Sequence, residues 1–336
     1  MKALPDLKEY SVLTPDMDYI YFEEGDRFPL EPDKHDFSPV NAWWFSEFSF
    51  LAYCHPGFAR LAATIAGYDH FRFFQGKGTE CMVFWNDETA IAAFRGTELN
   101  SLSTFHEIIT DLNTIPTDFH LGGKVHRGFL KGLHEIRDGK EGLNHTISTL
   151  LDEKPDRPLW ITGHSLGGAL ATLCFAETPD AAGLYVYGAP RVGDREFVAL
   201  TEGRPAWRVE HGNDPIPLVP LDVPSAGFGF GDVGELVFID RDGNLSPERP
   251  TVNFSEEIEK IKSAIQDKKK DRTSNEKELT ISENVAEIGA EIKAHIDESL
   301  KGWKNLFKTL DKGLSLKILD HMPIYYCIKL WNNLLS

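Results

Sequence analysis

The stretch from Leu159 to Leu173, LWITGHSLGGALATL, constrains this chain more than any other. Its first four residues, Leu159–Thr162, are mostly apolar and predict a short buried strand. The pattern G-x-S-x-G follows at Gly163–Gly167, and the Ala- and Leu-rich run Gly168–Phe175 predicts a helix. A serine at a tight turn between a strand and a helix is typical of a nucleophile elbow.

The physics of the elbow explains the glycines beside Ser165. A serine at so sharp a turn has a strained backbone, and side chains at positions 163 and 167 would collide with it. The serine oxygen is then held beside the N-terminus of the following helix, where free N–H groups and the helix dipole stabilise negative charge. A glycine-rich turn that contains a serine by chance is the alternative. The strand before it and the helix after it favour a nucleophile.

An activated serine needs a base within hydrogen-bond reach and an acid that orients the base. In hydrolases built on such an elbow the chain order is serine, acid, histidine. Three histidines follow the serine: His211, His295 and His321. His295 lies in a charged helical stretch that indicates a surface role, and His211 precedes any suitable acid.

Asp214 is the best candidate for the acid. It follows the strand that is expected to end near Val209, inside a turn rich in Gly and Pro. With Asp214 as the acid, His321 remains as the base. The alternatives are an ordinary Asn-Asp turn residue for Asp214 and a capping or core histidine for His321. Together with the elbow, the two residues favour a catalytic triad.

The same reaction needs donors for the developing oxyanion, and losing one donor typically costs about 10²–10³ in turnover. The N–H of Leu166, directly after the nucleophile, is one candidate. The second donor is expected in a turn after an earlier strand, where Arg95-Gly96-Thr97 lies. Thr97 offers an N–H and a hydroxyl. On chemistry alone, this role and a simple helix cap at Thr97 remain equally open.

The pattern of elements predicts an α/β fold. Strands and helices alternate from Cys81 to Pro220, which indicates an open, mostly parallel sheet with helices on both faces. The expected strands are Cys81–Trp85 and Ala90–Phe94 as a hairpin, then Leu184–Tyr187, Ala206–Val209 and Glu235–Ile239. The expected helices outside the elbow are Val40–Cys54, Leu99–Ile115 and Leu133–Leu151. Lys124–Phe129 is expected to form a strand followed by a turn, and residues 1–38 look irregular.

Composition narrows the class of partner. The formal net charge of −17 over 336 residues argues against nucleic acid and against electrostatic docking on anionic lipid. No segment has the length of a membrane span. The N-terminus lacks the apolar stretch of a cleavable signal, so we expect a cytoplasmic protein or signal-independent export.

Cys81 and Cys174 are expected to be buried apolar residues.

Several motifs in this order resemble the class 3, fungal-type triacylglycerol lipases of the α/β-hydrolase superfamily. They are AAFRGT, an amphipathic segment ending in TDL, KVHRGF, ITGHSLGGALA, YGAPRVGD and HGNDPIPLVP. The resemblance covers roughly residues 71–238, together with His321. It implies that Ser165 is the nucleophile, Asp214 the acid and His321 the base. It also implies an oxyanion hole of Thr97 and Leu166, and no metal or cofactor.

The resemblance further implies a lid helix over the active site within residues 99–115. Its apolar face would carry Phe105, Ile108, Ile109 and Leu112, which fall at i, i+3, i+4 and i+7. Such a lid hides an apolar cleft in water and exposes it at an oil surface. His164 and Arg191 also lie in family motifs, and we interpret them as structural.

The chain departs from the family pattern before its C-terminus. A charged helical insertion at residues 254–312 separates the last expected strand from His321, within what we expect to be a single α/β-hydrolase domain of residues 1–336. The end of this insertion pairs Trp303 and Phe307 with lysines. A helix lying on a membrane and a helix packed beside the active site are both compatible with that pattern, and we favour the second.

The sequence therefore predicts a serine carboxylester hydrolase that acts on lipid esters at an oil–water or membrane interface. Phospholipase A1 and a soluble-ester esterase, such as a feruloyl esterase, are alternatives that change only the substrate. A binding protein that keeps a hydrolase fold without turnover is a more distant alternative, because Ser165, Asp214 and His321 are all present.

Overall fold

The fold is described from a computed structural model, in residues 1–5, 19–97, 116–139, 141–220, 229–249 and 319–336. The density of contacts divides the chain into one unit of residues 1–248 and 316–336 and another of residues 249–315. All elements named below belong to the first unit. The helix expected at residues 99–115 and the insertion expected at 254–312 lie outside the described residues.

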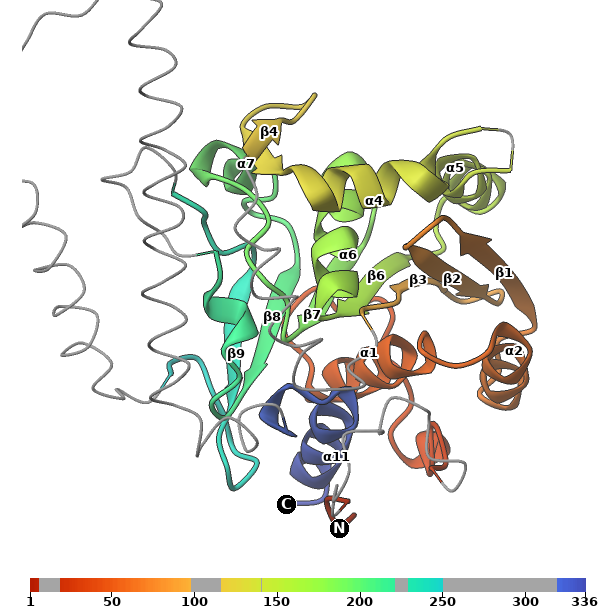
Figure 1. Cartoon of the computed structure of the whole chain (residues 1–336). Helices are drawn as coiled ribbons and strands as arrows, with labels where there is room; N and C mark the ends of the chain where they lie inside the picture. Colours follow the sequence, from red (N-terminus) through yellow and green to blue (C-terminus); the bar gives the residue numbers. More distant parts are fainter. Residues whose placement is uncertain (6–18, 98–115, 140, 221–228, 250–318) are drawn as a thin grey trace, which may run out of the picture. The chain divides into compact units, whose positions relative to one another are not determined.

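The first unit is built on an eight-stranded sheet of order β1-β2-β3-β6-β7-β8-β9-β10 (Figure 1). Neighbouring strands from β3 to β9 are parallel, and β1, β2 and β10 add antiparallel pairs at the two edges. The strands are β1 (His70–Gln75), β2 (Glu80–Trp85), β3 (Ala90–Phe94), β6 (Leu159–His164), β7 (Gly183–Tyr187), β8 (Ala206–His211), β9 (Glu235–Ile239) and β10 (Leu245–Ser246). The predicted mostly parallel sheet of an α/β fold is confirmed.

Helices cover both faces of this sheet. Consecutive residues of a strand point to opposite faces, and β6 shows this at its end. Thr162 donates its hydroxyl to the Phe45 carbonyl of α1 (Pro39–Leu51) at 3.2 Å. A Cβ on the next residue, Gly163, would lie 2.4 Å from the Gly167 backbone of α6 (Leu166–Glu177). The helix α11 (Pro323–Leu334) packs beside α1 (Figure 1).

The helix α1 confirms the prediction for Val40–Cys54, although it ends at Leu51. Ser38 caps its N-terminus by accepting the Asn41 N–H at 3.2 Å, and Pro39 occupies the first turn. Its apolar residues are buried almost all round, as expected for a helix between the sheet and α11. The helix also buries the charged residue Glu47, whose carboxylate accepts the Phe22 N–H and the Trp43 indole N–H, both at 3.2 Å.

The single helix predicted at Leu133–Leu151 is wrong. Two helices occupy this region, α4 (Arg127–Arg137) and α5 (Leu143–Glu153). Gly139 between them has φ +98°, a value that breaks an α-helix and favours glycine. The turn expected after residues 124–126 is also wrong. The strand β5 (Lys124–His126) is followed directly by α4, because the His126 ring accepts the Phe129 N–H at 3.3 Å and caps the helix.

Several elements were not predicted from the sequence. They are η1 (Gly25–Arg27), α2 (Pro56–Ile65), β1, β4 (Pro116–Asp118), α7 (Arg195–Ala199), η2 (Ile216–Leu218), β10 and α11. Cys81 and Cys174 are buried free thiols, as predicted. Among the helices that the structure describes, none combines the length and the hydropathy that a bilayer span requires.

Candidate active site

The turn between β6 and α6 has the geometry of a nucleophile elbow. Ser165 has φ 57° and ψ −129°, a left-handed conformation that costs a non-glycine residue about 1–3 kcal/mol. A Cβ on Gly167 would lie 2.2 Å from the Phe94 carbonyl oxygen at the end of β3. The strand and helix predicted around the elbow are confirmed, with each element slightly longer than expected. Glycines on both sides of the serine are therefore required by close backbone approach.

His321 lies against the Ser165 side chain, directly before α11. Its Nε2 atom is 2.9 Å from Ser165 Oγ, and its Nδ1 atom is 2.7 Å from Asp214 Oδ2. Because a carboxylate oxygen accepts, Nδ1–H donates to Asp214 and Nε2 is left to accept the serine proton. The structure thus brings together the three side chains that the sequence placed in a triad.

The other downstream histidine inside the described residues has a different position. His211, at the end of β8, donates from Nδ1 to the Asp320 carbonyl at 3.0 Å. Asp320 in turn accepts the Asn213 N–H on Oδ2 at 2.8 Å. These two bonds tie the segment before His321 to the turn that carries Asp214. His295 lies outside the described residues.

Asp214 is held by two further donors. Its Oδ1 accepts the Ile216 N–H at 2.9 Å, and its Oδ2 accepts the Tyr326 hydroxyl at 2.7 Å. Burial and the nearby Asp214 charge raise the pKa of Tyr326 well above its ordinary value, so the phenol stays protonated and donates. Sequence reasoning missed Tyr326. No local pattern marks it, because the contact depends on how α11 packs.

The group is almost completely buried. The exposed fraction is 1 % for Ser165, 0 % for His321 and 7 % for Asp214. Gly188, at the end of β7, closes one side with φ +54°, and a Cβ there would lie 2.6 Å from Asp214 Oδ2. Electrostatic interactions within such a water-poor site are stronger than in bulk water.

A buried chain of hydrogen bonds also reaches the backbone of His321. His164 Nε2 lies 2.7 Å from the His321 carbonyl oxygen, and Tyr53 Oη lies 2.8 Å from His164 Nδ1. The carbonyl can only accept, so His164 donates from Nε2 and accepts the Tyr53 hydroxyl on Nδ1. Burial, followed by the nearby His321, lowers the pKa of His164 well below its ordinary value and keeps the ring neutral. His164 therefore holds the backbone of His321 through a hydrogen bond.

The two oxyanion candidates belong to two segments next to the elbow, the start of α6 and the turn after β3. Leu166 is the first residue of α6, so its N–H has no acceptor within the helix. Thr97 follows Gly96, where a Cβ would lie 2.5 Å from the His164 carbonyl oxygen and 2.1 Å from Tyr53 Oη. The turn after β3 therefore runs directly past the elbow. The lid candidates Phe105, Ile108, Ile109 and Leu112 lie outside the described residues.

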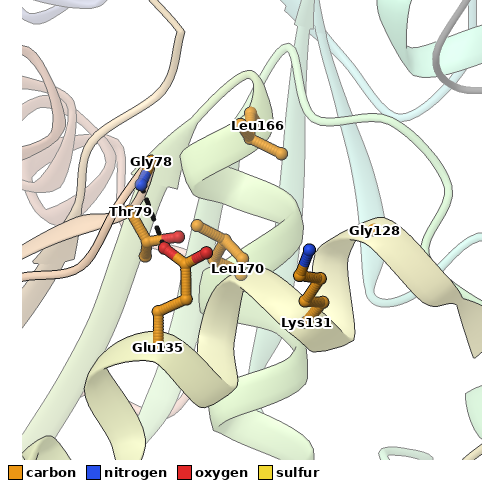
Figure 2. Close-up of a pocket in the computed structure, with 8 residues that line it drawn as sticks. Gly78, Thr79, Gly128, Lys131, Glu135, Leu166 and Leu170 are labelled. Atoms are coloured by element: carbon orange, nitrogen blue, oxygen red, sulfur yellow. Dashed lines mark hydrogen bonds between the residues drawn. The ribbon is translucent and has the colours of Figure 1, made fainter.

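A cavity of about 200 Å³ opens on the far side of Leu166, between the β1–β2 turn, α4 and α6. Figure 2 shows Lys131 and Glu135 of α4 facing Leu166 and Leu170 of α6. Glu135 accepts the Gly78 N–H at 3.0 Å, which ties the β1–β2 turn to α4. Ser165 is not among the residues that line this cavity, whereas Leu166, the residue after it, is.

Comparisons with known proteins find similarity over part of this chain. Residues 91–223 match the family described as lipase (class 3). The chain is similar to a lipase of Rhizomucor miehei, with 33 % identity over 46 % of this chain and 42 % of that protein. It is also similar to the chloroplastic phospholipase A(1) DAD1 of Arabidopsis thaliana, with 36 % identity over 39 % of this chain and 33 % of that protein.

Among solved structures, the chain is similar to a triacylglycerol lipase whose catalytic centre is described as a serine protease triad. The TM-score is 0.49 and the identity 26 %, over 65 % of this chain and 88 % of that one. The chain spans less than half the length of the curated relatives named above. The matched region contains β3, the elbow and Asp214. The similarity of this chain to the class 3 lipase family is therefore carried by residues 91–223.

Proposed function

We propose that this protein is a serine carboxylester hydrolase that acts on lipid esters, with triacylglycerols as the first substrate class to test. The observation that carries the proposal is the continuous chain of contacts from Ser165 Oγ through the His321 ring to Asp214, at 2.9 and 2.7 Å. Such a chain makes a serine hydroxyl reactive near neutral pH, because the imidazole takes the proton as the oxygen attacks. The elbow places Ser165 directly before the first residue of α6.

Each step of the proposed reaction has a residue suited to it. Ser165 Oγ attacks the ester carbonyl carbon while His321 Nε2 takes the serine proton, and Asp214 stabilises the resulting imidazolium. The tetrahedral oxyanion is held by the N–H groups of Leu166 and Thr97 and by the Thr97 hydroxyl. Collapse of the intermediate breaks the ester bond, and His321 returns the proton to the leaving alcohol. Water, activated by the same imidazole, then releases the acid from the acyl-enzyme.

The family match supports an ester of a fatty acid as substrate, and two relatives suggest different head groups. One is called a lipase and the other a phospholipase A(1). A lipase and a phospholipase of this type would use the same serine chemistry, so the described site favours neither. Phospholipase A1 activity is accordingly the second candidate function, and a panel of emulsified triolein, phosphatidylcholine and a short nitrophenyl ester separates the two.

The deciding experiment compares Ser165→Ala with wild type on this panel. We expect the substitution to lower kcat by at least about 10⁴-fold, because the nucleophile itself is removed. Ser148→Ala is the matched control, since Ser148 is an exposed serine on α5 that should keep full activity. Labelling with a fluorophosphonate probe should disappear in the first variant and persist in the second. Wild-type rates in Ser165→Ala would refute the proposal.

A further inference from the structure

The helix α2 exposes its large apolar residues and buries its small ones. The residues of this helix that are buried are Ala59 and Ala63. Leu61 is 60 % exposed and Ile65 is 80 % exposed, and Phe58 is also exposed. Surface helices of globular proteins normally have the opposite arrangement, with the large apolar side chains directed to the core.

The exposed residues form a stripe along the helix. Phe58, Leu61 and Ile65 are spaced i, i+3 and i+7, so they lie on one side of α2. The helix α2 contacts β1 and β2 (Figure 1), and Ala59 and Ala63 are the residues that it buries. Ile20 adds a fourth exposed apolar side chain, and its neighbour Tyr21 packs against Phe58 with ring centroids 5.9 Å apart. We call these four residues, Ile20, Phe58, Leu61 and Ile65, the α2 stripe.

The segment around α2, which carries three of the four residues of the α2 stripe, is poor in charge. The segment from Cys54 to Tyr68 contains no Asp or Glu, and Arg60 is its one permanently charged residue. The whole chain, by contrast, carries a formal net charge of −17. An anionic surface would be repelled by the rest of the chain. The stripe therefore fits a partner that is apolar and uncharged.

The size of the α2 stripe argues against a protein partner. A stable protein interface takes roughly 20–30 residues on each side, and the four apolar side chains of the α2 stripe are far fewer. A lipid surface needs no matching shape, because side chains such as Phe, Leu and Ile enter the boundary between head groups and acyl chains one by one. Tyr53, which precedes α2 in the chain, has its hydroxyl 2.8 Å from His164 of the candidate active site.

We propose that the α2 stripe is a docking surface for neutral lipid, which seats the protein on an oil droplet or a zwitterionic membrane by inserting Leu61, Ile65 and their neighbours. The choice of lipid as partner rests on the proposed function, while the exposure of the stripe does not.

The test measures binding of the full chain carrying Ser165→Ala, so that lipid is not consumed, to phosphatidylcholine vesicles by flotation. Adding Leu61→Gln and Ile65→Gln should weaken partitioning by about tenfold for each side chain, since burying one such side chain is worth about 1.5–3 kcal/mol and 1.4 kcal/mol is tenfold. The matched control is Arg60→Gln on the same helix but off the stripe, which should bind as the parent does. Replacing part of the phosphatidylcholine by phosphatidylserine should weaken binding of the Ser165→Ala parent.

Three results would overturn the proposal. One is unchanged binding of the double variant; another is tighter binding to the anionic vesicles. The third is a dimer of the parent that becomes a monomer in the double variant, by light scattering, because a second copy would then occupy the stripe. If circular dichroism shows that the double variant is unfolded, the single variant Ile65→Gln is compared with the parent instead. Failure of the proposed function is read separately, from hydrolysis of a dissolved nitrophenyl ester, which the stripe variants should leave unchanged when Ser165 is present.

Discussion

Replacing Tyr326 by Phe removes one hydroxyl and keeps the ring, so it isolates a single contact to the candidate acid. In the structure this hydroxyl donates to Asp214 Oδ2 at 2.7 Å, and Tyr326 is fully buried. A hydrogen bond to a charged group contributes about 1.5–3 kcal/mol, against about 1 kcal/mol for one between neutral groups. Since the remaining ring fills the same space, water does not replace the lost donor. We therefore expect the free energy of unfolding at pH 7 to fall by about 1.5–3 kcal/mol.

Urea denaturation monitored by tryptophan fluorescence measures this loss, with Tyr325→Phe as the matched control. The hydroxyl of Tyr325, the preceding residue on α11, donates to the neutral Pro5 carbonyl at 3.2 Å. Its removal should cost about 1 kcal/mol or less. Because the Tyr326 hydroxyl fixes the carboxylate that orients His321, we also expect kcat to fall in Tyr326→Phe with KM unchanged.

A double-mutant cycle with Asp214→Asn tests the assignment to this one contact. In the Asn background the acceptor is neutral, so the cost of Tyr326→Phe should drop to about 0.5–1.5 kcal/mol. Equal costs in the two backgrounds, or a cost in the wild-type background no larger than that of Tyr325→Phe, would refute the reasoning.

Three further predictions concern the same site. Asp214→Asn should lower kcat by about 10⁴-fold on a dissolved ester, because an amide NH₂ facing Nδ1 favours the His321 tautomer that carries its proton on Nε2; activity within tenfold of wild type would contradict the triad. Gly188→Ala should lower kcat/KM by about 100-fold, because a Cβ at this position, where φ is +54°, lies 2.6 Å from Asp214 Oδ2 and must displace the carboxylate; steady-state kinetics within twofold of wild type would show that the site absorbs the methyl group. The lowered pKa of His164 means that the unfolded chain binds a proton below about pH 6.5 that the folded chain does not. Stability should therefore fall as pH decreases from 6.5 to 5, by up to about 1.4 kcal/mol per pH unit for this group, and less steeply in His164→Gln; equal slopes in urea titrations would refute the burial of a neutral His164.

The sequence predicted best those elements whose pattern is local. The apolar runs of β2, β3, β6, β7 and β9 and the glycines of the elbow are short-range signals, and each predicted a strand or turn that the structure contains. The helix expected at Leu133–Leu151 failed because its periodic pattern continues across the break at Gly139. The helix α2 has Pro56 at its start and Gly67 two residues after it, which are helix-boundary signals, but its exposed apolar face gave no amphipathic pattern directed to a core.

The same distinction between local and long-range features holds for the residues of the candidate active site. By itself the sequence determined the nucleophile's surroundings, because the left-handed turn at Ser165 and the contact between Gly163 and Gly167 involve consecutive residues whose backbone sterics are local. Chain order then ranked Asp214 and His321 among the candidates without showing that they meet. Only the tertiary structure decided which side chains surround the serine, because the contacts of His321 with Ser165 and Asp214 join residues 156 and 107 positions apart. The donor Tyr326 comes from α11, and the donor Tyr53 comes from the segment that follows α1. These two helices pack against each other, and packing between distant parts of the chain leaves no periodic pattern in a sequence.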